Sequence, residues 1–184
     1  MNNHQQKRGC NCGMRRKSAT SSRKVNEKKD DLRQVINIGP YVMFSSSNAG
    51  MDIRQDGNYP LPLSLMSMKS GTVFSATRDG RVQILKDGNY DIMVSGMLTR
   101  TLLGTQNNVP GVKAYISVTS LSPDGSTDEV IRYYMAFNDV YQEFVAESAT
   151  PLSNGAVVSA KIVVSNIGNF PIHIDQAQLC VNVV

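Results

Sequence analysis

The 184-residue chain lacks the residues and motifs on which most enzyme active sites are built. It has no tryptophan, three cysteines and two histidines, and it contains no P-loop, no dinucleotide-binding glycine motif, no zinc-protease motif and no serine-hydrolase motif. Three cysteines do not make a disulfide framework. These absences predict a protein that is not an enzyme and uses no cofactor, so its function must rest on assembly and surface chemistry.

Long apolar runs are also missing from the chain. No stretch reaches the ~18 apolar residues that a membrane-spanning helix needs. The charged N-terminus lacks the apolar segment of a secretory signal. We therefore expect no membrane partner and no export signal.

Five glycine turns separate short alternating apolar runs. They are Asp56-Gly57, Asp79-Gly80, Asp87-Gly88, Asp124-Gly125 and Asn154-Gly155. Asp-Gly and Asn-Gly tolerate the positive φ angles of tight hairpins, so their recurrence favours an antiparallel sheet protein. The runs predict about ten strands and almost no helix, with strands near residues 41–45, 60–67, 72–76, 81–86, 89–100, 111–121, 129–137, 140–147, 156–165 and 171–184.

Alternation within these runs predicts which residues face the interior. In the run 89–100, Tyr90, Ile92 and Val94 share one face, and the runs beginning at residues 112 and 158 repeat the pattern. The last run changes parity between Ile174 and Leu179. This change predicts a bulge or bend near residues 175–178.

The run 130–137 (VIRYYMAF) has apolar or aromatic residues on both faces. Such a strand either lies centrally in a sandwich or packs against another subunit. Tyrosine and methionine are enriched in subunit contacts, so the second interpretation makes Tyr133, Tyr134, Met135 and Phe137 candidate oligomer-interface residues. Both interpretations stay open at this point.

The positive charge of the chain is concentrated near its N-terminus. Residues 1–33 contain ten basic and three acidic residues, whereas the rest of the chain contains nine basic and twelve acidic residues. Because almost nothing apolar offsets the entropy of ordering, residues 1–36 are predicted to form a disordered basic arm and residues 37–184 a single domain. Seven basic residues meet no acid within residues 1–24, namely Lys7, Arg8, Arg15, Arg16, Lys17, Arg23 and Lys24.

These seven residues are the candidate anchoring or polyanion-binding group. They could bind nucleic acid or another polyanion through its phosphates alone, because residues 1–33 contain no aromatic side chain that could stack on bases. Alternatively, the arm anchors the domain in a socket formed by other proteins of a larger particle. A tail that merely keeps the chain soluble is the third interpretation.

Few residues could hold a metal ion or carry catalysis. Cys10 and Cys12 supply two thiolates where structural zinc takes four ligands, so a site would need His4 or neighbouring chains, and interchain disulfides or an inert pair are the alternatives. Aspartates in turns mostly stabilise the local backbone, with a Ca²⁺ site as the alternative. His173 is expected to face solvent, and its odd spacing from Cys180 separates the two unless a bulge intervenes. We predict no metal site and no catalytic residue.

The run GRVQILKDGNYDIMVSGMLTR, residues 80–100, resembles the strand, glycine turn and tyrosine-led long strand at the centre of C1q/TNF-like jelly rolls. Residues 41–50 are similar to the first strand of that family, and the closing DQAQLCVNVV is similar to its last, central strand. Phage fibre heads and spore-surface glycoproteins of bacilli carry such domains. The basic arm departs from the family pattern and more loosely resembles the arms of small jelly-roll viral coat proteins.

The resemblance implies an all-β, antiparallel jelly-roll sandwich of about ten strands that assembles as a homotrimer, with the Tyr90 ring turned inward. Together with the arm, it implies a non-enzymatic structural protein of the virion surface, such as a phage head fibre, decoration protein or tail appendage. A small viral capsid protein with a nucleic-acid-binding arm is the alternative. A spore-surface protein is a further one.

Overall fold

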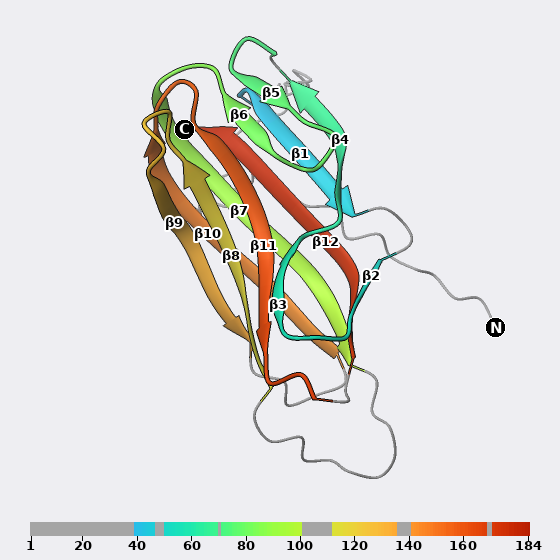
Figure 1. Cartoon of the computed structure of the whole chain (residues 1–184). Coiled ribbons are helices and arrows are strands. Elements are labelled where there is room, and N and C mark those ends of the chain that lie inside the picture. Colours follow the sequence, from blue (N-terminus) through green and yellow to red (C-terminus); the bar gives the residue numbers. More distant parts are fainter. Residues whose placement is uncertain (1–38, 47–49, 70, 101–111, 136–140, 169–170) are drawn as a thin grey trace, which may run out of the picture. The chain divides into compact units, whose positions relative to one another are not determined.

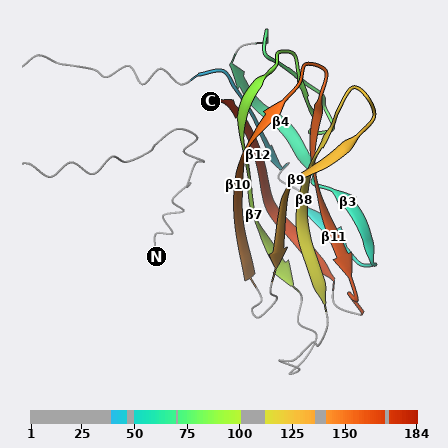
Figure 2. The ribbon, with the colours of Figure 1, turned by 90° about the vertical axis from the view of Figure 1, so that its left-hand side faces the viewer.

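Two antiparallel six-stranded sheets pack against each other as a sandwich (Figures 1 and 2). The computed structural model describes residues 39–46, 50–69, 71–100, 112–135, 141–168 and 171–184. The β12 sheet contains β1 (Tyr41–Ser46), β2 (Met51–Ile53), β4 (Leu63–Lys69), β7 (Gly88–Arg100), β10 (Tyr141–Leu152) and β12 (Ile172–Val183). The β11 sheet contains β3 (Gly57–Pro60), β5 (Phe74–Ala76), β6 (Val82–Ile84), β8 (Lys113–Leu121), β9 (Thr127–Met135) and β11 (Val157–Ser165).

The strand order is that of a jelly roll. One sheet runs β10-β7-β12-β1-β4 with β2 added on β12, and the other runs β5-β6-β11-β8-β9 with β3 added on β11. The C-terminal strand β12 therefore lies between β7 and β1, at the centre of its sheet (Figure 1). The expected all-β antiparallel fold is confirmed, and none of the described residues is helical.

The inward faces follow the predicted alternation. Ile92 and Val94 of β7 are fully buried, as are Val158 and Ile162 of β11. Tyr90 is 1% exposed. Its ring packs edge-on against Phe74 at 5.8 Å and its hydroxyl donates a hydrogen bond to the Lys86 carbonyl. A buried tyrosine needs such a polar partner, and this hydrogen bond lets Tyr90 be buried without leaving its hydroxyl unsatisfied.

The predicted bulge in β12 is confirmed. The register with β7 shifts between Ile174 and Gln176, and Ala177, Leu179 and Val181 are buried beyond the shift. Gly96 of β7 pairs with Ala177, and a Cβ atom at Gly96 would lie 2.3 Å from the Gln176 carbonyl oxygen. The bulge therefore brings the two backbones close together and requires glycine at this position.

The five predicted turns fall into two groups. Gly80, Gly125 and Gly155 have φ angles of 76°, 85° and 89°, as tight turns require. Gly57 and Gly88 instead begin β3 and β7. The aspartates before them bind distant backbone, as described below.

Two short strands, β2 and β3, were not predicted. They contain three and four residues. β2 pairs with the part of β12 that β1 does not reach, and β3 pairs with the part of β11 that lies beyond β6. The predicted boundary between residues 36 and 37 stays a prediction, because the arm and its seven basic residues lie outside the described part of the chain.

Candidate functional site

The outward face of the β12 sheet carries apolar side chains that lie side by side across its strands. Met43 of β1 is opposite Cys180 of β12, which is in turn opposite Met93 of β7. Further along β7, Met97 is opposite Glu143 of β10. All three methionines are half-buried rather than fully covered.

The same face becomes more exposed towards β10. Tyr141 is 64% exposed and Val145 is 63% exposed, so two large apolar side chains stand in solvent on one strand. We call Met43, Met93, Met97, Tyr141 and Val145 the methionine face. Exposed apolar patches of this kind on soluble proteins mark interaction sites more often than chance placement does.

The charges on the β7 and β10 part of the methionine face have one sign. The charged residues at the outward positions of β7 and β10 are Asp91, Glu143 and Glu147, all of them acidic. Because no lysine or arginine occupies an outward position on these two strands, the carboxylates have no basic neighbour from their own strands. This part of the face is thus both apolar and negatively charged.

The residues predicted to form an oligomer interface separate between the two sides of β9. Met135 is 6% exposed, and the Tyr133 ring packs towards Phe144 at 6.5 Å inside the sandwich. Tyr134 points outward and is 68% exposed. Phe137 lies outside the described residues. Only Tyr134 of the described candidates therefore presents an exposed side chain to a partner, and its interface role stays a prediction.

Tyr134 belongs to an exposed aromatic and cationic cluster. Its ring lies 5.5 Å from that of Tyr115, and the Arg132 guanidinium stands 5.1 Å from the centre of the Tyr115 ring. Arg132 also donates to the Tyr134 hydroxyl at 3.3 Å. We call Tyr115, Arg132 and Tyr134 the tyrosine patch. Tyrosine and arginine are the residue types that dominate binding hot spots.

A hydrogen-bonded acid holds this patch in place. Arg132 is paired with Glu129 at 2.5 Å, and Glu129 accepts a hydrogen bond of 2.6 Å from Ser117, which is 1% exposed. Burial raises the pKa of Glu129, but the hydrogen bonds from Ser117 and Arg132 outweigh it, so the pKa is lowered. The hydrogen bond to Glu129 also raises the pKa of Arg132. Both charges therefore persist at neutral pH.

His173 faces outward, as predicted, but it is bound. Its Nδ1 lies 2.6 Å from Asp52 on β2, and its Nε2 lies 3.9 Å from Asp175. The hydrogen bond with His173 is the main reason that the pKa of Asp52 is lowered. The bulge does place His173 and Cys180 on the same face, but seven residues along one strand separate them by roughly 20 Å. The arrangement does not bring a nucleophile and a base together.

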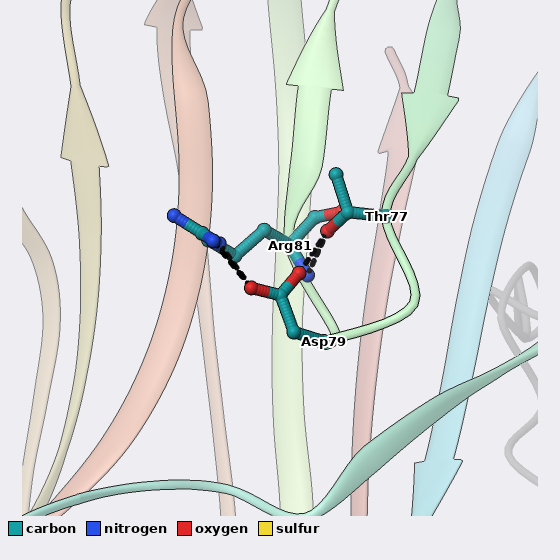
Figure 3. Close-up of polar contacts among 3 residues, drawn as sticks. All are labelled: Thr77, Asp79 and Arg81. Atoms are coloured by element: carbon teal, nitrogen blue, oxygen red, sulfur yellow. Dashed lines mark hydrogen bonds and ion pairs between the residues drawn. The ribbon is translucent and has the colours of Figure 1, made fainter.

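A polar turn connects β5 and β6 (Figure 3). Asp79 accepts hydrogen bonds from the Thr77 hydroxyl and from Arg81, whose Nε lies 2.7 Å from the carboxylate. The Thr77 hydroxyl also accepts the Arg81 backbone N–H at 3.1 Å. These bonds, with the Arg81 contribution largest, lower the pKa of Asp79 from its ordinary 3.8 to about 2. This aspartate has the local role expected of turn residues.

Asp56 and Asp87 act over long distances in the sequence. Asp56 accepts the backbone N–H groups of Asn166 and Ile167 at 2.9 Å each, and Asp87 accepts that of Asn154 at 2.6 Å. The Asp-Gly pairs predicted local turns for these two aspartates. Which distant loop each of them binds depends on the tertiary structure.

No group of three histidine, cysteine, aspartate or glutamate side chains in the described part of the chain is arranged to hold a metal ion. Within the same residues, no helix is long and apolar enough to cross a membrane. The candidate zinc ligands His4, Cys10 and Cys12 and the seven basic arm residues lie outside the described ranges.

The methionine face was missed by the sequence analysis, although part of its signal was present. The alternation that buries Ile92 and Val94 necessarily turns Met93 and Met97 outward. The contribution of Met43 could not be seen, because it depends on which strand pairs with which.

Comparisons with known proteins identify the fold. No protein-family model and no curated protein matches the chain. Among solved structures, murine APRIL at pH 8.0 is similar with a TM-score of 0.55 and 12% identity, covering 78% of this chain and 98% of that chain. Murine APRIL at pH 5.0 gives 0.51 and 13%, covering 73% and 97%. Eiger TNF from S. frugiperda gives 0.51 and 10%, covering 80% and 94%.

At such low identity the similarity concerns the architecture. It agrees with the sandwich of two antiparallel sheets described above. The expected resemblance is confirmed at this level: the described domain has the C1q/TNF-like jelly-roll fold.

Proposed function

We propose that the chain is a non-enzymatic structural protein of a virion surface, a homotrimer that its N-terminal arm anchors to the particle. The observation that carries the trimer is the methionine face, an outward sheet surface with half-buried methionines and an exposed tyrosine and valine. Methionine side chains adapt their shape to a partner and are enriched in subunit contacts. A β-sandwich in solution has no need of such residues on its outward face.

A ring of three subunits requires two different, complementary surfaces on each subunit. The tyrosine patch is the natural complement of the methionine face, because it offers two tyrosine rings and the guanidinium of Arg132, which Glu129 already pairs, to a surface that is apolar and acidic. Arg132 of one subunit would approach Glu143 and Glu147 of the next, with Tyr134 packing on the methionines. Opposite charges at the rim of an apolar contact guide the orientation of the subunits.

The arm supports attachment to a larger particle. Its seven unopposed basic residues bind an acidic protein socket in this proposal, and the binding weakens as salt rises. The alternative is a capsid protein whose arm packages nucleic acid. Nuclease-protected nucleic acid in purified particles, together with an arm that resists protease until the shell opens, would favour the capsid protein.

Light scattering on the purified protein tests the trimer. We expect a mass near three times 20.1 kDa for the parent protein. Met93→Glu should give a folded but dissociated protein, because a buried charge without a partner is strongly disfavoured in a dry contact.

The control is Leu121→Glu, which puts the same charge at an apolar residue of β8 that is 47% exposed and lies outside both the methionine face and the tyrosine patch. This variant should remain trimeric. A monomeric parent, or a Met93→Glu protein that is folded by circular dichroism and still trimeric, would refute the proposed interface.

A further inference from the structure

A pocket of about 520 Å³ opens at one end of the sandwich. It is lined by residues at the start of β7 and β9, at the ends of β8 and β10, and in the connection from β10 to β11. These elements meet at the end of the sandwich drawn uppermost in Figure 1. All of its described lining residues belong to the jelly-roll domain. Its volume lies in the range of about 300–1,000 Å³ that is typical of small-molecule sites.

The lining is unusually polar for a pocket between two sheets. Seven of its twelve residues carry hydroxyl, amide or carboxylate side chains: Asp87, Asn89, Ser120, Ser122, Asp128, Thr150 and Ser153. Small-molecule pockets are lined mostly by apolar groups, with few polar ones. A polar lining of this density suits a ligand that offers many hydrogen-bonding groups of its own.

Ser120 points inward from the floor of this pocket. It continues the inward-facing series of β8 after Ile116 and Val118, and it is 2% exposed. Its hydroxyl has no hydrogen-bond partner among the described residues, although the rest of the inward face of β8 is apolar. The Oγ atom is not among the enclosed polar atoms that lack a partner, so it is reached from the pocket, where a ligand group or water can hydrogen-bond to it.

Asp128 extends the same site to the rim. It is the cross-strand neighbour of Ser120, on the same face of the sheet, and it is exposed. Within the described part of the chain its carboxylate accepts no hydrogen bond. Directly opposed residues in antiparallel strands have Cβ atoms about 5 Å apart, so one ligand can reach both side chains.

The charge of the lining restricts the ligand. Asp87 and Asp128 are acidic, and no lysine, arginine or histidine occurs among the described lining residues. An anionic ligand such as a phosphate or an acidic sugar would be repelled. Serine and threonine hydroxyls both donate and accept hydrogen bonds, and carboxylates accept them, which matches the hydroxyl groups of an uncharged polyol.

We infer that this pocket binds a small, neutral, polyhydroxylated ligand of the mono- or disaccharide class, with Ser120 at its floor and Asp128 at its rim. The sugar hydroxyls donate to the Asp128 carboxylate and exchange hydrogen bonds with Ser120. For a ligand of about a dozen heavy atoms, a dissociation constant near the millimolar range is expected. A structural protein with this pocket could recognise a glycan surface.

The test is titration of the full-length ¹⁵N-labelled protein with glucose, galactose, mannose, N-acetylglucosamine and their common disaccharides, followed by NMR chemical shifts. At least one of these sugars should shift the amide signals of Ser120, Asp128 and Thr150. Ser120→Ala removes the hydroxyl without adding volume, and Asp128→Asn removes the charge at an exposed position. Each change should weaken the binding of that sugar about tenfold, as expected when a hydrogen bond to a charged or buried group is lost.

Ser148→Ala is the matched control. Ser148 faces the same interior from β10 but does not line the pocket, so its loss should leave sugar affinity unchanged. The inference is overturned if no sugar in the panel shifts these signals, or if Asp128→Asn and Ser120→Ala both bind as the parent does. It is also overturned if calcium chloride shifts the signals and no sugar does, since the site would then be a cation site.

Discussion

The outward faces of the two sheets differ, although their inward faces follow the same alternation. On the β11 sheet, polar side chains bind one another: Ser117 donates to Glu129, Glu129 pairs with Arg132, and Thr119 lies 3.2 Å from Ser159. On the β12 sheet, His173 binds Asp52 near one end, but Met93 and Val145 also occupy outward positions and cannot form hydrogen bonds. The two faces lie on opposite sides of the sandwich (Figure 2).

The difference shows that the two outward faces of a sandwich can have different roles although both are built from antiparallel strands. A face whose polar groups are satisfied internally is stable in water as it stands. Covering a face of half-buried methionines with a partner stabilises the assembly, because burying apolar area is favourable at roughly 25 cal/mol per Å². The β12 sheet is therefore the better candidate for assembly, and the tyrosine patch at the edge of the other sheet is the better candidate for its counterpart.

The largest effect is expected from the interior that both faces share. Tyr90→Ala removes a ring that is 1% exposed and packs on Phe74, so it should lower the free energy of unfolding by ~3 kcal/mol or more at any protein concentration. Urea denaturation measures this. A loss that disappears at high protein concentration would mean that Tyr90 stabilises the assembly rather than the subunit.

The next effect concerns the tyrosine patch. Tyr134→Glu puts a charge where the ring is 68% exposed in the single subunit, so the subunit should fold normally while the trimer dissociates. Circular dichroism together with light scattering distinguishes the two levels. A trimer of unchanged mass would remove the tyrosine patch from the interface and would break the proposed pairing of the two faces.

A smaller effect should distinguish the outward face of the β11 sheet, whose polar side chains bind one another, from the apolar outward face of the β12 sheet. Glu129→Ala leaves the buried Ser117 hydroxyl without its acceptor, so stability should fall by about 1 kcal/mol. Glu147→Ala, beside Met93 on the β12 sheet, should leave the stability of the subunit unchanged. Equal effects of the two changes in thermal unfolding would show that the polar network on the β11 sheet is not what distinguishes the faces.

The smallest effect is expected at the exposed turn in Figure 3. The pKa of Asp79 is about 2, below its ordinary 3.8, so the contribution of its bonds is present above pH ~3.8 and is lost as the pH falls towards ~2. Arg81→Met removes the largest cause, and NMR titration should then find the pKa of Asp79 closer to 3.8. An unchanged pKa would mean that Thr77 and the backbone alone hold the carboxylate.

Local pattern was sufficient for most strands and for the residues that face inward. The alternation around Tyr90 and the change of parity before Leu179 are properties of consecutive residues, so the long strands and the bulge could be predicted. The run 130–137 could not be resolved in this way. Both of its faces are apolar or aromatic, and only the packing shows that Met135 is inside the subunit while Tyr134 is outside.

The sequence by itself determined an all-β domain, its turns and its inward faces, because hydrophobic alternation and glycine conformation act between near neighbours. Only the tertiary structure decided which strands pair, and with them every feature that joins distant residues. Asp56 binds the backbone at Asn166, Met43 joins Met93 across β12, and Ser120 faces a pocket closed by β10. The physical reason is that cross-strand and inter-sheet contacts depend on the order of strands, which local periodicity does not specify.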